Sequence, residues 1–176
     1  MNLTLRYYGD PILRKQSESI EKITDEHRTL ATSMVNYIDG NNGIGLSAVQ
    51  IGLPIRLFVC RSYIENPDGS WGVTVPRVFI NPKIIFISEE TIVDNEACMS
   101  IPKVREDVQR PYRIKVEAID LDGKTFIEES VGYNARIRMH ENDHLNGVLF
   151  IDRLPPKIRK KIEPQLREIK KKYSIN

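Results

Sequence analysis

The sequence contains few cysteines and no long hydrophobic run. Its 176 residues include two cysteines, Cys60 and Cys98, which excludes a disulfide-rich scaffold and favours a reducing compartment. No apolar run approaches the ~20 residues that a membrane-spanning helix requires. The N-terminal residues show neither the charged-then-apolar pattern of a secretion signal nor an Arg- and Ser-rich transit pattern. We therefore expect a cytoplasmic protein with no membrane partner.

Excess charge of one sign is also scarce, except near the C-terminus. The 26 basic and 24 acidic residues leave a net charge of +2, so the chain as a whole lacks the basic character of a specific DNA-binding protein. Residues 157–173 are the exception, because eight basic and two acidic side chains give this segment a charge of +6. Its apolar residues recur at spacings of three and four, which predicts a basic amphipathic helix with a break at Pro164.

The pattern of apolar residues changes twice along the chain. Thr24 is a predicted N-cap, and the helical spacing after it predicts a helix that ends near residues 39–43. Short apolar runs separated by turn signals predict a β-rich middle, in which residues 63–76 form a hairpin loop or an insertion. Helical spacing returns from Tyr133. This order predicts an α+β fold, and the length suits a single domain over residues 1–176.

The sharpest motif is His140-Glu141-Asn142-Asp143-His144. Only three histidines occur in the chain, and these two lie four residues apart. On a helix such residues share one face, so both imidazoles can bind one metal ion, with Glu141 beside them to take a proton from a water molecule. A helix with two ordinary histidines is the alternative.

Two imidazoles leave a catalytic tetrahedral metal site one protein ligand short. Cys98 can supply a thiolate, which favours zinc or iron over magnesium or calcium. A downstream carboxylate, Glu163 or Glu168, is the other choice, as in zinc peptidases of the thermolysin type. A buried, purely structural cysteine is the alternative for Cys98, although Cys60, at the end of an apolar run, fits that description better.

A third segment, Gly43 to Gln50, contains two glycines that would let the backbone approach a ligand closely. A glycine-rich turn after a helix is the plainer interpretation. The segment is not a phosphate-binding loop, because the GxGxxG spacing fails and no lysine follows at the required position.

Taken together and in this order, the three segments resemble the peptide deformylase family. The family motifs GxGLAAxQ, EGCLS and HExDH stand here as Gly43-Ile-Gly-Leu-Ser-Ala-Val-Gln50, Glu96-Ala-Cys-Met-Ser100 and His140-Glu-Asn-Asp-His144. The resemblance extends from Gly9-Asp10-Pro11 to the basic C-terminal helix, which is similar to that of the type 1 bacterial enzymes. It implies mixed or antiparallel β-sheets around a central helix that carries HExxH, with an N-terminal helix and a C-terminal amphipathic helix.

The resemblance also implies an activity, the hydrolysis of the formyl group from N-formylmethionyl peptides at the start of new polypeptides, with release of formate. It implies that Cys98, His140 and His144 bind the metal and that Glu141 is the general acid/base while metal-activated hydroxide attacks the formyl carbon. Gln50 and the backbone N–H of Met99 would stabilise the reacting oxygen. The metal would be Fe²⁺ in the cell, with Ni²⁺, Co²⁺ or Zn²⁺ possible after purification. Independently of the resemblance, the charge of the basic helix suggests docking on ribosomal RNA or protein, and a solvated helix face packed through its apolar stripe is the alternative.

The substrate methionine requires an apolar pocket. Ile44, Tyr133 and Ile137 are predicted to line it, because Ile137 shares the metal-facing side of the helix. Gly45 would lie beside the substrate peptide, and Arg105 would contact the substrate backbone. An ordinary core position is the alternative for the apolar residues, and solvent exposure is the alternative for Arg105.

Three positions depart from the family motifs. Ser47 and Ala97 replace an alanine and a glycine, and Met99 replaces a leucine. Buried Ser47 would need a hydrogen-bond partner. If the Ala97 position requires a positive φ or a close contact with the substrate backbone, its methyl group would cost roughly 1 kcal/mol or more. A deformylase-like protein that binds N-terminal peptides with little turnover is therefore the alternative function.

Overall fold

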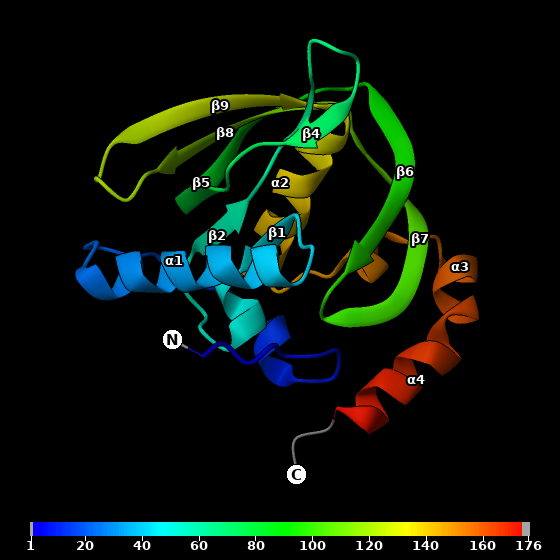
Figure 1. Ribbon diagram of the computed structural model, residues 1–176. Coiled ribbons are helices and arrows are strands. Elements are labelled where there is room, and N and C mark those ends of the chain that lie inside the picture. Colours follow the sequence, from blue (N-terminus) through cyan, green and yellow to red (C-terminus); the bar gives the residue numbers. More distant parts are fainter. Residues whose placement is uncertain (1, 174–176) are drawn as a thin grey trace.

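The computed structural model describes residues 2–173 and shows the expected α+β fold (Figure 1). The helices are α1 (Asp25–Gly40), α2 (Gly132–Leu145), α3 (Pro156–Lys161) and α4 (Glu163–Lys172), with short 3₁₀ turns at Pro11–Arg14, Ala48–Ile51 and Phe150–Arg153. The strands are β1 (Gly45–Ser47), β2 (Leu57–Cys60), β3 (Tyr63–Glu65), β4 (Trp71–Val73), β5 (Arg77–Ile87), β6 (Thr91–Cys98), β7 (Ile101–Pro111), β8 (Arg113–Ile119) and β9 (Thr125–Val131). Within the described range, no helix is both long and apolar enough to cross a bilayer.

The strands form one large sheet and two hairpins, all antiparallel. The large sheet has the order β1-β2-β5-β8-β9, whereas β3–β4 and β6–β7 pair only with each other. Helix α2 contacts four strands of the large sheet and also β7, and it crosses the centre of the molecule (Figure 1). Helix α1 packs against β1 and β2. The predicted central helix between antiparallel sheets is therefore confirmed.

Helix α2 is buried on nearly every side. Ala135, Ile137, Met139 and Leu145 pack with Phe58 and Phe79 of the large sheet. The other sides of α2 are charged and nevertheless buried, as the next section describes. A helix buried all round cannot be amphipathic, so its polar residues must find partners inside the protein.

Local signals predicted several element boundaries correctly. Helix α1 follows Thr24, and residues 63–76 contain the β3–β4 hairpin. The basic C-terminal segment is broken, as expected, but the break lies at Ile162 and gives two helices rather than one. Pro164 occupies the first turn of α4, where its missing N–H removes no helical hydrogen bond.

Two strands differ from the sequence expectations. The segment from Gly45 to Ser47, for which a turn was the plainer interpretation, is an edge strand paired with β2. Strand β7 was not predicted, because charged residues alternate along it with few apolar ones, and only Val104 and Val108 are buried apolar residues in its middle. Both strands are part of the site.

Candidate active site

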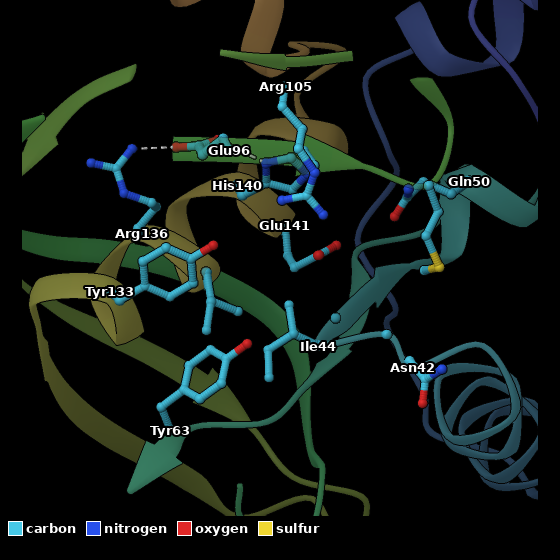
Figure 2. Close-up of a pocket in the computed structure, with 15 residues that line it drawn as sticks. Asn42, Ile44, Gln50, Tyr63, Glu96, Arg105, Tyr133, Arg136, His140 and Glu141 are labelled. Carbon is cyan, nitrogen blue, oxygen red and sulfur yellow. Dashed lines mark hydrogen bonds and ion pairs between the residues drawn. The ribbon is translucent and has the colours of Figure 1, made fainter. Parts of the chain in front are cut away.

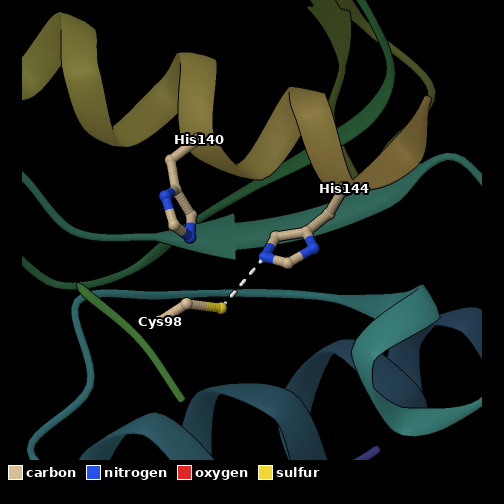
Figure 3. A group of neighbouring side chains, drawn as sticks. All are labelled: Cys98, His140 and His144. Carbon is tan, nitrogen blue, oxygen red and sulfur yellow. Dashed lines mark hydrogen bonds between the residues drawn. The ribbon is translucent and has the colours of Figure 1, made fainter. Parts of the chain in front are cut away.

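Cys98, His140 and His144 come together at the centre of the protein (Figure 3). One potential ligand atom from each residue lies within 4.8 Å of the other two. Cys98 Sγ is 3.3 Å from His144 Nε2. The two histidines lie one turn apart on α2, and Cys98 is the last residue of β6, where the register with β7 shifts. Neither Glu163 nor Glu168 belongs to this group, and Glu163 pairs with Arg159 on the protein surface.

The donor set fits a divalent transition metal. A metal about 2.3 Å from sulfur and about 2.0 Å from nitrogen places tetrahedral ligand atoms about 3.5 Å apart. The Cys98–His144 separation of 3.3 Å is close to this value. Thiolate and imidazole donors are those that iron and zinc accept. Three protein ligands would leave one coordination position open, as in catalytic rather than structural sites.

The two histidines differ in protonation. Burial and the neighbouring His140 lower the pKa of His144 well below its ordinary value, so this imidazole is neutral, as a metal ligand must be. Burial opposes protonation of His140 too, but hydrogen bonds with Cys98 and Glu96 raise its pKa well above the ordinary value. Because metal ligands must be deprotonated, we expect metal binding to release this proton.

The carboxylate of Glu96 orients the imidazole ring of His140. Its Oε2 lies 2.9 Å from His140 Nδ1, which leaves Nε2 for the ligand cluster. Arg110 binds both oxygens of the same carboxylate, at 2.6 and 3.0 Å, and Arg136 donates to Oε1 at 2.8 Å. Although burial of the carboxyl opposes ionisation, these hydrogen bonds hold the pKa of Glu96 well below its ordinary value. Glu96 and Arg110 therefore form a buried ion pair.

Asp143 completes this buried network from the same helix. Arg110 donates to its Oδ2 at 2.7 Å, and Arg153 binds both oxygens at 2.6 and 2.5 Å. Arg110 therefore bridges two carboxylates, one on β6 and one on α2. The network ties the β6–β7 hairpin to the helix that carries both histidines.

Glu141 is buried beside the metal ligands and packs against strand β1. Gly45 is a glycine for a steric reason, because a Cβ added there would lie 2.5 Å from Glu141 Oε1. Ser47 Oγ is 2.7 Å from Glu141 Oε2 and 2.9 Å from the Glu141 carbonyl oxygen. Buried Ser47 therefore has the partner that it requires. Burial raises the pKa of Glu141, although His140 and the Ser47 hydroxyl oppose this effect.

Gln50 links this strand to the cysteine. Its Oε1 accepts the Ser47 N–H at 2.9 Å, and its Nε2 donates to Ser100 Oγ at 3.1 Å. The same Nε2 lies 3.5 Å from Cys98 Sγ. The amide of Gln50 is thus oriented by β1 and directed toward the ligand cluster.

A pocket of about 240 Å³ opens onto His140 and Glu141 (Figure 2). Every residue predicted to contact substrate or the reacting oxygen lines this pocket: Ile44, Gly45, Gln50, Met99, Arg105, Tyr133 and Ile137. The Arg105 side chain is exposed at its rim. Figure 2 shows Tyr133 and Tyr63 next to each other at the lower left of the view, and their ring centroids are 5.6 Å apart in an edge-to-face contact.

Comparison with known proteins identifies this arrangement. The family model of polypeptide deformylase matches residues 3–160. The chain belongs to the peptide deformylase family. A peptide deformylase of Pseudothermotoga lettingae is 41% identical over 165 residues, which cover 94% of this chain and 90% of that relative. A peptide deformylase of Bradyrhizobium diazoefficiens is 45% identical over 145 residues, which cover 82% of this chain and 83% of the relative.

Solved deformylase structures share the fold. The structure of Arabidopsis thaliana peptide deformylase 1B has a TM-score of 0.87 at 36% identity, over 97% of this chain and 92% of that chain. The Thermotoga maritima enzyme has a TM-score of 0.79 at 36% identity, over 89% and 99% of the two chains. Peptide deformylases are metal-dependent hydrolases that remove the formyl group from N-formylmethionyl peptides, and family membership assigns this reaction to the chain.

The structure decides one part of the question about Ala97. Ala97 lies in extended β6, paired with Arg105, and it is not among the positive-φ residues of the described chain. Its methyl group therefore causes no left-handed strain, while its place in the pocket lining keeps the contact with the substrate backbone as a prediction.

Arg136 and Tyr63 are among the residues of the pocket wall that sequence reasoning missed. Arg136 is buried and precedes His140 by one helical turn, which is the signal that could have indicated it. Tyr63 comes from a hairpin about 70 residues before Tyr133, and no local pattern connects the two.

Proposed function

We propose that different residues of this pocket carry out the separate steps of deformylation. Cys98, His140 and His144 hold the metal, and Glu141 moves the proton. The observation that supports this proposal is the convergence of a thiol, two imidazoles and a buried carboxyl at one end of a pocket. When bound, the metal supplies Lewis acidity, which makes a water molecule more acidic and stabilises negative charge on oxygen.

Glu141 accepts the proton of the attacking water and then gives it to the leaving amine nitrogen. Water adds to the formyl carbon, the C–N bond breaks, and the products are formate and a free amino terminus. A carboxyl group suits this exchange when its pKa is raised toward the working pH, and burial raises that of Glu141. Gly45 and Ser47 hold the carboxylate against β1, with one oxygen at each.

Gln50 and the backbone N–H of Met99 stabilise the negative charge that develops on the formyl oxygen. Gln50 uses one amide hydrogen for Ser100, and the second is directed toward Cys98, where the reacting group would lie. A preorganised donor of this kind contributes about 3 kcal/mol to the rate.

The methionine side chain of the substrate occupies the apolar part of the pocket. Ile44, Tyr133 and Ile137 line this part, and all three come from the segments that carry the chemistry. Arg105, exposed at the rim, would contact the backbone of the following substrate residues.

We propose Fe²⁺ as the metal in the cell, with Ni²⁺, Co²⁺ or Zn²⁺ as substitutes in purified protein. A mixed thiolate and imidazole donor set accepts each of these ions. The decisive experiment measures formate release from a formyl-Met tripeptide by protein loaded anaerobically with Fe²⁺ or Ni²⁺, beside Glu141→Ala. We expect release that disappears in the variant while bound metal remains. Release at the wild-type rate by Glu141→Ala would contradict the role of this residue.

We also propose that α3 and α4 dock on the ribosome. The buried apolar stripe of these helices (Ile162, Leu166 and Ile169) holds them on the protein, while Lys160, Lys161 and most of the other basic side chains face solvent. Such a surface suits RNA phosphates. Lys160→Gln with Lys161→Gln should weaken cosedimentation with ribosomes and reduce its salt dependence. The control pair Lys22→Gln and Lys124→Gln, also exposed, should leave cosedimentation unchanged. Equal effects of the two pairs would contradict docking through this segment.

A further inference from the structure

The β3–β4 hairpin forms part of the pocket wall but has no role in the proposed reaction. It contributes Tyr63 to the pocket and then extends away from it. Figure 1 shows it as an arm near one end of α2, outside the five-stranded sheet.

Side chains of α2 hold the base of this arm in place. The Asn134 amide makes two hydrogen bonds with the backbone of Tyr63, from the Tyr63 N–H at 2.8 Å and to its carbonyl oxygen at 2.9 Å. Arg138 donates to Ser62 Oγ at 2.6 Å and to the Arg61 carbonyl oxygen at 2.9 Å. The hairpin therefore has a defined orientation relative to the helix that carries the metal ligands.

One face of the hairpin continues the pocket wall. In the register of this hairpin, Tyr63 lies opposite Val73 and Glu65 lies opposite Trp71. Directly opposite residues project to the same face, and successive residues alternate between faces. These four side chains therefore share one face, and Ile64 projects from the other. Because Tyr63 lines the pocket, the Glu65–Trp71 pair extends this face away from the pocket.

This face is apolar and open to solvent. Trp71 is 69% exposed and Val73 is 46% exposed, although they stand on a supported hairpin. Tyr63 and Tyr133, which join this face to the pocket, are 38% and 39% exposed. A large apolar surface that is held in place and continuous with a ligand pocket is typical of a binding surface.

We infer that this face binds the substrate chain beyond its formylated first residue and favours apolar side chains there. The inference rests on the proposed function, because it extends the same pocket. We place the second substrate residue beside Tyr63; because two strand residues span about 7 Å, the fourth residue then reaches Trp71. The exposed Glu65 carboxylate on the same face disfavours acidic side chains at these positions.

The first test compares three substrates: formyl-Met-Ala-Ser and its extensions by Leu-Phe or by Asp-Glu. We expect the highest kcat/KM for the Leu-Phe extension. Trp71→Ala should lower kcat/KM for that peptide about fivefold and leave the tripeptide within about twofold. Ile127→Ala is the matched control, because Ile127 is an apolar side chain 60% exposed on β9 that does not line the pocket. It should change neither value.

The second test needs no turnover. Trp71 is the only tryptophan of the chain, so tryptophan emission, excited selectively over the seven tyrosines, reports on this face alone. Metal-loaded Glu141→Ala should show a blue shift of tryptophan emission with the Leu-Phe peptide and none with the tripeptide. This measurement separates the two proposals, because failure of deformylation would abolish formate release without preventing the shift.

Several outcomes would overturn the inference. Equal kcat/KM for the three substrates, or equal effects of Trp71→Ala on all of them, would exclude a contact with the downstream residues. Unchanged emission with the long peptide would do the same. A concentration-dependent dimer that Trp71→Ala abolishes would assign the face to a second copy of the chain instead.

Discussion

Replacing Gly45 with alanine should disable catalysis without removing the metal. A Cβ at this position would lie 2.5 Å from Glu141 Oε1, 2.9 Å from its Cδ and 3.0 Å from its Cγ. The backbone of Gly45 is extended and accepts any residue, so the conflict is purely steric. The carboxylate must therefore move, although Ser47 holds its other oxygen at 2.7 Å.

The size of this movement sets the expected effect. Ordinary contacts begin near 3.4 Å, so Oε1 must retreat by roughly 1 Å. A displacement of this size in a catalytic group costs on the order of 100-fold in rate. Overpacking of the buried contact should also lower the free energy of unfolding by about 1–3 kcal/mol. The three atoms nearest to the added methyl group all belong to Glu141 rather than to Cys98, His140 or His144, so metal content should not change.

The assay measures kcat with a formyl-Met peptide, the metal content per chain, and unfolding by denaturant. Gly40→Ala is the matched control, because apart from the adjacent backbone of its own helix no atom lies within 4 Å of a Cβ added there. Gly40→Ala should keep full kcat and unchanged or slightly higher stability. If Gly45→Ala keeps more than half of the wild-type kcat, the proposed placement of the Glu141 carboxylate by β1 is refuted.

Three further substitutions test the rest of the site. Glu141→Gln should keep its metal and lose about 10²- to 10⁴-fold in kcat, and a loss below tenfold would argue against proton transfer by this residue. Cys98→Ala should lose bound metal, whereas Cys60→Ala should keep it, because burial raises the pKa of Cys60 to about 12 and leaves it a neutral thiol away from the cluster. Equal metal content in the two variants would point to another third ligand. Arg110→Ala leaves the buried carboxylates of Glu96 and Asp143 short of a partner and should cost about 3–5 kcal/mol of unfolding free energy; a loss under about 1 kcal/mol in denaturant titration would show that the network is not essential for folding.

Features that depend on neighbours in sequence could be predicted without the structure. Helix α1 begins after Thr24, and the hairpin lies within residues 63–76, because capping and turn residues act locally. The pairing of His140 with His144 follows from the helical repeat alone. Strand β7 could not be predicted in this way, since its charged residues interrupt the apolar pattern and Arg110 finds its partners on β6 and α2.

The third potential metal ligand could not be identified from local sequence patterns. From spacing alone, Cys98 and the carboxylates Glu163 and Glu168 were all eligible, and the family motif rather than any local rule favoured the cysteine. The fold decides between them, because the β6–β7 hairpin brings Cys98 to the histidines while α4 carries both glutamates to the surface. The reason for Gly45 is likewise visible only in three dimensions, because the carboxylate that excludes a side chain there belongs to a residue 96 positions later. Helical and turn signals act over a few residues, whereas a metal site and a tightly packed carboxylate depend on contacts between distant segments, which only the packed chain specifies.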